Sequence, residues 1–251
     1  MAVITVVAYV LIYDGIGNNT SGVSLVSFDG QPVPQSLISQ LGVPNNVNSK
    51  VGIGYAGTTY LTKIVSSELT MNGKPVIIYI GAESCPFCAM ERWGLIVALL
   101  RFGNFSGLEY MTSSPTDVGP NTPTFTFVNS TYISPYLVFQ PYELADRFNN
   151  PLQTAPQNYM NLFQKAGGGY PFIDYANKSE QLGANVDDLN ILANTSWSTI
   201  AGTLYNSSSL QSLSLLGTAN LITAQICKLT NETPTSVCGQ SYIKSIENRL
   251  S

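Results

Sequence analysis

The chain has 251 residues, a formal net charge of −4 and no histidine, and only 10% of its residues are charged. An ordinary soluble protein has about 25% charged residues. The eleven Lys and Arg are scattered along the chain, which argues against a nucleic-acid partner. The lack of histidine excludes Ser-His and Cys-His nucleophiles and His-containing zinc sites. The length suits one large domain with or without a small appendage.

The first thirteen residues, "MAVITVVAYVLIY", form an apolar run. As a helix this run spans roughly 20 Å, which is less than the ~30 Å of a hydrocarbon core. It has no basic start of the kind that signal peptides carry. Three interpretations stay open: the remainder of a signal-anchor, a short signal h-region, or a buried strand rich in β-branched residues. We take residues 1–13 as a signal-anchor or apolar N-terminal segment, and expect a membrane tether there.

Residues 14–70 read as a linker with N-terminal strands. Gly, Asn, Ser and Pro are frequent between residues 14 and 50, and a single apolar alternation at 22–30 predicts a strand there.

Residues 71–251 read as the main domain, and this domain begins with a strand, a helix and a strand. The apolar run "KPVIIYIGA" (74–82) is typical of a strand buried on both faces. Helical spacing of apolar residues follows over 85–102 and ends at Gly103. A second strand is predicted at 107–114, and together the three segments predict a right-handed βαβ unit.

The rest of the chain continues the alternation of strands and helices. Two aromatic, β-branched runs predict a hairpin or two edge strands, and the later segments predict a helix, a strand and two amphipathic helices. These segments are, in order, 122–132, 134–144, 154–169, 170–178, 187–206 and 207–227. The fold class is therefore α/β, with an inserted β-hairpin and extra C-terminal helices.

The motif Cys85-Pro86-Phe87-Cys88 opens the first predicted helix directly after the buried strand. At such a position the helix dipole and the free N–H groups favour a thiolate at Cys85, while Cys88 lies one turn further in. This arrangement suits a thiol–disulfide exchange pair, with Cys85 as attacking thiol and Cys88 as resolving thiol. Zinc and a purely structural disulfide are the alternatives. Zinc is disfavoured because the only other cysteines are eleven residues apart and the chain has no histidine.

Four stretches together resemble a known family: "GAESCPFCAMERWGLIVALLRFGNFSGL", "PNTPTFTFV", "YPFIDYANK" and "ANLITAQICKLTNETPTSVC". They resemble an archaeal family of extracytoplasmic thioredoxin-like proteins from thermoacidophiles, which is catalogued as a domain of unknown function. The resemblance covers most of residues 70 to 240. It implies a thioredoxin-like fold, a secreted or membrane-tethered location and a thiol–disulfide activity, and it implies no substrate.

A thioredoxin-like fold further implies a cis-proline opposite the two cysteines. Pro171 suits this role because it follows a predicted helix and a Gly loop and precedes an apolar strand. Pro123 is the rival candidate. The plainer alternative is a trans proline at the start of an edge strand.

Three acids lie near these elements. Glu83 and Glu91 flank the motif, and Asp174 lies on the strand after Pro171. A carboxylate near the resolving cysteine could take up its proton, but a solvated helix face is the simpler interpretation for Glu83 and Glu91.

Cys227 and Cys238 lie at the end of the last long helix and across a loop. A bridge between them closes a short segment, and in the chain-entropy account it stabilises the fold by about 2–3 kcal/mol. We expect a structural disulfide here; a second redox pair is the alternative.

Eight Asn-x-Ser/Thr sequons favour an exported glycoprotein, since a low charge content and paired cysteines point the same way. The sequon asparagines are Asn18, Asn19, Asn104, Asn129, Asn177, Asn194, Asn206 and Asn231.

The sequence as a whole predicts an extracytoplasmic thiol–disulfide oxidoreductase-like protein on the outer face of the cell. It acts on protein clients, carries N-linked glycans, and needs no cofactor, metal or nucleic acid. The alternative is a structural or interaction glycoprotein, such as a surface-layer or filament subunit, in which the motif is only a staple. A third possibility is an accessory subunit of a membrane complex that holds clients through mixed disulfides.

Overall fold

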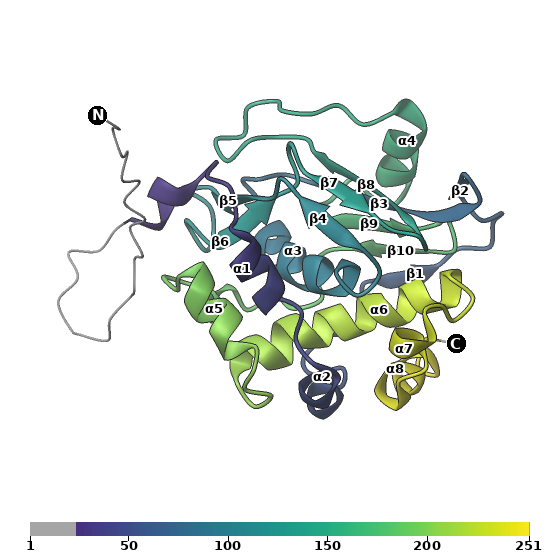
Figure 1. Ribbon diagram of the computed structural model, residues 1–251. Helices are drawn as coiled ribbons and strands as arrows, with labels where there is room; N and C mark the ends of the chain where they lie inside the picture. The colour runs from purple at the N-terminus through teal and green to yellow at the C-terminus, as the bar shows by residue number, and fades with distance from the viewer. Residues whose placement is uncertain (1–23, 251) are drawn as a thin grey trace, which may run out of the picture.

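The computed structural model describes residues 24–250, which form a mixed α/β fold, so the predicted fold class is confirmed (Figure 1). The main sheet has β3 at its centre, with a parallel neighbour on one side and an antiparallel one on the other. Its strands, across the sheet, are β1 (Leu61–Lys63), β10 (Ser179–Leu182), β9 (Phe172–Tyr175), β3 (Lys74–Gly81) and, beyond β3, β8 (Val138–Glu143) and the short β2 (Thr70–Met71).

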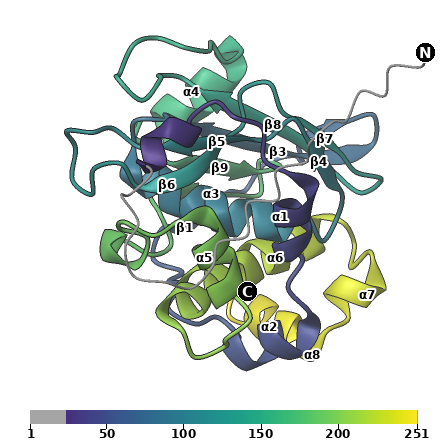
Figure 2. The same ribbon diagram turned by 60° about the vertical axis from the view of Figure 1, so that its left-hand side comes forward.

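Helices cover both faces of this sheet, as the two ribbon views show (Figures 1 and 2). Helix α4 (Gln157–Lys165) lies on one face, and α3 (Pro86–Leu99) and α6 (Gly217–Leu229) lie on the other. Side chains of a strand alternate between faces. Accordingly Ile78 of β3 packs in the cluster with α4, whereas Ile77 and Tyr79 pack in the cluster with α3 and α6. A strand buried on both faces explains the unbroken apolar run at 74–82.

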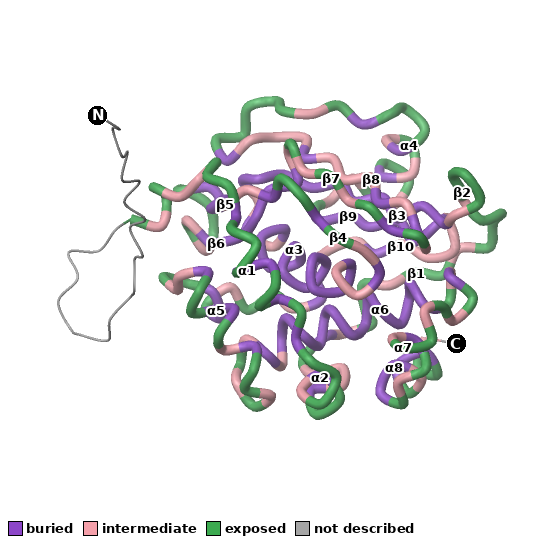
Figure 3. The backbone as a smooth tube through the Cα atoms, in the orientation of Figure 1, coloured by how far each residue is buried: buried purple, intermediate pink, exposed green. Residues whose placement is uncertain are grey.

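Helix α3 is buried along almost its whole length (Figure 3). It crosses α6 closely at Gly94, where an added Cβ would lie 2.4 Å from Thr218 Cγ2. A side chain at this position would push the two helices apart. The motif at the start of α3 is therefore held between the sheet and a second helix.

The insertion between α3 and β8 differs from the prediction. It forms two separate antiparallel pairs, an inner pair of consecutive strands and an outer pair of strands that flank it in the chain. The pairs are β4 (Asn104–Ser106) with β7 (Thr131–Ile133), and β5 (Glu109–Thr112) with β6 (Pro123–Thr126). The strand predicted at 107–114 exists as β5, but the parallel partner of β3 is β8. The predicted βαβ unit is therefore formed by β3, α3 and β8, and the two strand pairs are inserted between α3 and β8.

The N-terminal part is more helical than predicted. The strand expected at 22–30 is wrong, since Leu25–Phe28 form the 3-10 helix η1. Two short helices follow, α1 (Gln35–Gln40) and α2 (Asn45–Val51), each starting directly after a proline. Proline suits the start of a helix because its missing N–H would be unpaired there in any case. The expectations for residues 1–13 and for Asn18 and Asn19 lie outside the described residues. No helix of the described part is long and apolar enough to span a bilayer.

The C-terminal part is helical, in shorter pieces than expected. Segment 187–206 contains a 3-10 turn, η2 (Leu189–Ile191), and α5 (Trp197–Thr203), and Ser196 caps α5 by accepting from Thr199 N–H. Segment 207–227 starts with a turn and continues through the π-helical turn η3 (Ser212–Leu216) into α6. Two further helices, α7 (Thr235–Cys238) and α8 (Ser241–Glu247), pack against α6.

Candidate functional site

Cys85 is the N-cap residue of α3, at the carboxyl end of the central strand. Its sulfur accepts a hydrogen bond of 3.1 Å from the backbone N–H of Cys88, and Pro86 occupies the first helical turn. An N-cap is usually an oxygen acceptor such as Ser or Asp, so a sulfur in that place accepts best as a thiolate. Both cysteines of the motif are free thiols; Cys85 is half-buried and Cys88 is buried.

The pKa values of the two thiols are shifted in opposite directions. The hydrogen bond with Cys88 lowers the pKa of the Cys85 thiol below its ordinary value, against the effect of burial, and Arg92 lowers it further. Burial raises the pKa of Cys88 well above the ordinary value, and the neighbouring Cys85 raises it further. The half-buried Cys85 thiol is therefore the more acidic one, and the buried Cys88 thiol stays protonated.

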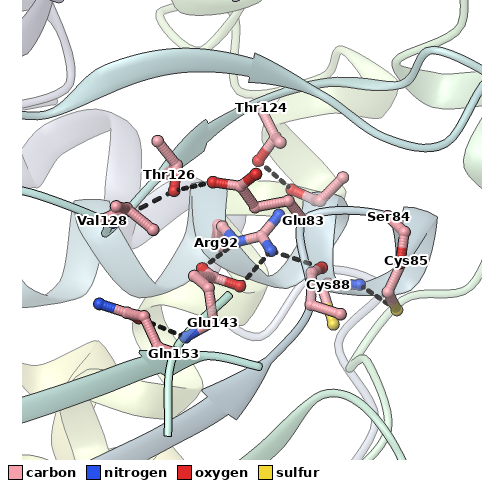
Figure 4. A network of polar contacts seen from close by, with 12 residues as sticks. Glu83, Ser84, Cys85, Cys88, Arg92, Thr124, Thr126, Val128, Glu143 and Gln153 are labelled. Carbon is pink, nitrogen blue, oxygen red and sulfur yellow. Dashed lines mark hydrogen bonds and ion pairs between the residues drawn. The ribbon is translucent and has the colours of Figure 1, made fainter. Parts of the chain in front are cut away.

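A buried ion pair lies beneath the motif (Figure 4). Arg92, one turn after Cys88, donates from Nε and Nη2 to the two carboxylate oxygens of Glu143 at 2.8 and 2.7 Å. The Nη2 group also donates to the carbonyl oxygen of Ala82 at 2.7 Å. Both side chains of the pair are completely buried. Although burial alone would lower the pKa of Arg92, Glu143 raises it, so that the guanidinium stays charged.

Tyr79 lies over this ion pair. The Arg92 guanidinium carbon is 5.9 Å from the centroid of the Tyr79 ring. The buried Tyr79 hydroxyl and Arg92 Nη1 have no hydrogen-bond partner among the described residues. Burial raises the pKa of Tyr79, Arg92 lowers it, and Cys88 raises it, so all three groups are within electrostatic reach of one another. The positive charge of Arg92 thus acts on the Cys88 thiol as well.

Glu83 and Glu91 are both buried, so the solvated-face interpretation is wrong for both. Glu83 accepts from Thr126 Oγ1 at 2.6 Å; burial raises the pKa of its carboxyl, while Thr126 and Arg92 lower it. Figure 4 shows Glu83 beside Arg92. Glu91 accepts from Gln181 and Asn185, and burial raises its pKa to about 7.

Asp174, on β9, is also buried. Its Oδ1 accepts from Asn177 N–H, and Oδ2 has no partner among the described residues. Burial raises the pKa of Asp174 to about 6.

Pro171 lies directly before β9, and the Tyr170–Pro171 peptide bond is cis, whereas Pro123 starts β6 and is not among the cis prolines. Burial raises the pKa of the neighbouring Tyr170, and Cys88 and Cys85 raise it further. Tyr170 therefore lies within electrostatic reach of both thiols, which associates Pro171 with the motif.

Hydrogen bonds from two loops, the one after β5 and the one after β8, fix the turn before α3. Glu83 N–H donates to the carbonyl of Ala145, Ser114 N–H donates to the carbonyl of Ser84, and Ser84 Oγ donates to Asn149 Oδ1. Phe148, next to Asn149, is 65% exposed. An exposed aromatic ring thus lies in the loop that contacts the turn before the motif.

The other predicted sites lie elsewhere. Cys227 and Cys238 form a disulfide between the last turn of α6 and the end of α7, so the predicted bond is confirmed. Six sequon asparagines lie in the described part; Asn177 is half-buried and the others are exposed. Within residues 24–250, no group of three or more Cys, Asp or Glu is arranged to hold a metal.

Sequence reasoning missed Arg92, Glu143 and Tyr79. One signal was available: Glu91 and Arg92 are the only charges in an otherwise apolar helix that is buried all round. Such charges must be paired or hydrogen-bonded. The partner Glu143 carried no signal, since its proximity depends on β8 pairing with β3.

Comparison with known proteins extends this picture in one respect. A family model described as a domain of unknown function, DUF929, matches residues 60–181. The match runs from β1 to β10 and includes the motif, Arg92, Glu143 and Pro171. The resemblance to a domain without an assigned function is thereby confirmed at this level. No curated protein and no solved structure matches the chain.

Proposed function

We propose that this protein is a thioredoxin-like thiol–disulfide oxidoreductase whose attacking thiol is Cys85. The observation that carries the proposal is the asymmetry of the two thiols. Cys85 is half-buried, caps a helix N-terminus and has a lowered pKa, whereas Cys88 is buried and has a raised pKa. An exchange pair needs one reactive thiol and one protected thiol, and a structural staple needs neither.

The topology supports this proposal. A thioredoxin-like core follows the order strand, helix, strand, helix, two antiparallel strands, helix. The chain follows this order through β3, α3, β8, α4, β9, β10 and α6, with the β4–β7 segment inserted after α3. Pro171 then takes the place of the proline that such folds put beside the thiols.

The proposed reaction moves two electrons between the motif and a client protein. The Cys85 thiolate attacks a client disulfide, a Cys85–client disulfide forms, and the other client sulfur leaves and takes up a proton. Cys88 then loses its proton and attacks the Cys85 sulfur, which breaks the mixed disulfide and releases the second client thiol. The client disulfide is reduced and the Cys85–Cys88 pair is oxidised; the reverse sequence oxidises a client dithiol.

Arg92 assists both steps by its charge. The guanidinium lowers the pKa of Cys85 and, to the extent that burial allows, that of Cys88. Glu143 fixes the guanidinium through two hydrogen bonds, so that the charge stays beneath the thiols. We assign Arg92 and Glu143 as positioning residues and Cys85 and Cys88 as catalytic residues.

The proposed location is outside the cytoplasm, on the outer face of the cell or beyond it. The disulfide between Cys227 and Cys238 suits an oxidising compartment, and exposed sequons suit N-linked glycans. The same two observations favour a second candidate, a structural cell-surface glycoprotein or membrane-complex subunit in which the motif has no exchange activity.

Trapping distinguishes the two candidates. A Cys88→Ser variant retains the attacking thiol and loses the resolving one, so it should accumulate mixed disulfides with a disulfide-containing test protein, seen on non-reducing gels. The matched Cys85→Ser variant should trap none. Equal amounts of mixed disulfide in both variants, or none in either, would reject the exchange function and leave the structural candidate.

A further inference from the structure

A pocket of about 610 Å³ lies between the edge of the main sheet and the end of α6, as far as the described residues show. Its walls are β1 with the segment that follows it, the turn before β10, the last turn of α6 and residues 249–250. In Figure 1, β1 lies beside the C-terminal part of α6. Cys85 lies beyond Gly81, the C-terminal end of β3. Ser179 in the pocket pairs with Tyr175, which in turn pairs with Ile77, nearer the start of β3. The pocket is therefore separate from the thiols.

Positive charge is concentrated in this pocket. Lining residues include four of the eleven basic residues of the chain and no acidic residue. The four are Lys63, Lys178, Lys228 and Arg249. The chain as a whole has a net charge of −4, so this local excess runs against its overall balance. Low-dielectric walls that carry one sign of charge attract ligands of the opposite sign.

Lys178 and Lys228 have hydrogen-bond donors that their contacts within the protein do not use. Lys178 Nζ donates to the carbonyl of Ser66 at 2.7 Å, and Lys228 Nζ to the carbonyl of Leu250 at 3.5 Å. An ammonium carries three donors, so each of these contacts leaves two. Among the ion pairs of residues 24–250, none involves any of the four basic residues.

The same pocket has an apolar part. Leu61, Ile64, Val65, Leu229 and Leu250 contribute to its lining, and Val65 is fully exposed. A fully exposed apolar side chain beside a cavity is available to pack against a bound molecule. The lining thus offers cations that can bind a charged head group and apolar side chains that can pack against an apolar part of the same molecule.

We propose that this pocket binds a phosphorylated amphiphile, a molecule with a multiply charged phosphate head and an apolar part. A phosphate with two negative charges suits a site with several cations better than a single carboxylate does, since each of its oxygens accepts from a separate donor. A membrane phospholipid and a free phosphorylated metabolite with an apolar part share this chemistry.

The test uses the full chain and three probes: dihexanoyl phosphatidic acid, inorganic phosphate, and phosphatidylcholine vesicles with and without phosphatidic acid. Titration calorimetry gives the affinity for the soluble probes, and co-sedimentation gives vesicle binding. The pocket variant is Lys63→Gln/Lys228→Gln. The matched control, Lys50→Gln/Lys165→Gln, removes the same charge at two exposed lysines outside the pocket.

We expect dihexanoyl phosphatidic acid to bind more tightly than inorganic phosphate. Removing two charge-assisted contacts should weaken that binding by about tenfold or more, whereas the control should change it by less than about twofold. If the protein co-sediments with phosphatidic acid vesicles and the pocket variant does not, the ligand is a membrane lipid. If the protein binds dihexanoyl phosphatidic acid but does not co-sediment with the vesicles, the ligand is a free metabolite. Equal losses in both double variants, or binding of none of the three probes, would overturn the proposal. Melting temperatures of both variants show whether they remain folded.

Discussion

The two cysteine pairs of this protein lie at opposite kinds of helix end. Cys85 and Cys88 are free thiols at the N-terminus of α3, above a buried ion pair. Cys227 and Cys238 are bonded to each other at the C-terminal ends of α6 and α7, and both are fully buried. A helix N-terminus stabilises a thiolate and a C-terminus destabilises it. The position of a cysteine in its helix therefore separates a pair suited to exchange from one suited to permanent cross-linking.

The largest effect should come from breaking the ion pair beneath the first cysteine pair. Arg92→Met leaves the Glu143 carboxylate buried without a partner, which should cost about 3–5 kcal/mol of unfolding free energy. It should also raise the pKa of Cys85, because a positive charge near the thiolate is lost. Urea unfolding measures the first effect and the pH dependence of alkylation measures the second.

Arg101→Met is the matched control. This arginine is half-buried and donates hydrogen bonds to Thr223, Asn48 and Asn220, and it is not among the groups that shift the thiol pKa values. It should lower the stability without moving the pKa of Cys85. A shift of that pKa in both variants would show that general loosening, rather than the charge of Arg92, controls the thiol.

The second prediction concerns the pH dependence of stability that comes from two buried acids, Glu91 and Asp174. Burial raises the pKa of Glu91 from 4.5 to about 7 and that of Asp174 from 3.8 to about 6. The folded chain thus binds these protons more tightly than the unfolded chain does. Their contribution to stability is complete at low pH. It is lost as the pH rises from the ordinary pKa of each carboxyl group to its raised pKa in the folded chain. For Glu91 alone the loss should be on the order of 3 kcal/mol between pH 4 and pH 8.

Glu91→Gln isolates this effect. Gln carries no titrating proton, so the unfolding free energy of the variant should fall less between pH 4 and pH 8 than that of the parent protein. Glu68→Gln, at an exposed position, should leave the pH dependence unchanged. Stability that rises with pH in the parent protein, or an unchanged slope in Glu91→Gln, would contradict the assignment.

The third prediction compares the stability that the two cysteine pairs contribute. Cys227→Ser/Cys238→Ser opens a loop whose ends are eleven residues apart, which should cost about 3 kcal/mol in the chain-entropy account. Cys85→Ser removes no bond from the free-thiol form and should cost less than about 1 kcal/mol under reducing conditions. Urea unfolding of the two variants without and with a reductant tests this order. A larger loss for Cys85→Ser would reverse the roles given to the two pairs.

The sequence predicted those parts of the fold that local pattern determines. The apolar run at 74–82 and the motif at Cys85 were enough for β3 and α3, and the proline and Gly loop were enough for the start of β9. The partner of β3 was not predictable in this way. Residues 104–133 form two strand pairs of their own, so the next strand in the chain is not the neighbour in the sheet.

The candidate site was predicted only in its outer part. Both cysteines and Pro171 followed from motif and context, but the ion pair depends on Glu143, whose position in β8 follows from a long-range strand register. Glu91 was misjudged because one charge on a helix normally faces water. In this helix every face is covered, by the sheet on one side and by α6 on the other.

The most direct test of the account is the pH dependence of alkylation at each thiol, measured by mass spectrometry on the reduced protein. We expect Cys85 to react first, with a pKa below that of an ordinary cysteine, and Cys88 to react only after Cys85 is modified or the chain is unfolded. Equal rates at the two thiols, or a pKa of Cys85 at or above the ordinary value, would contradict the assignment of Cys85 as the attacking thiol.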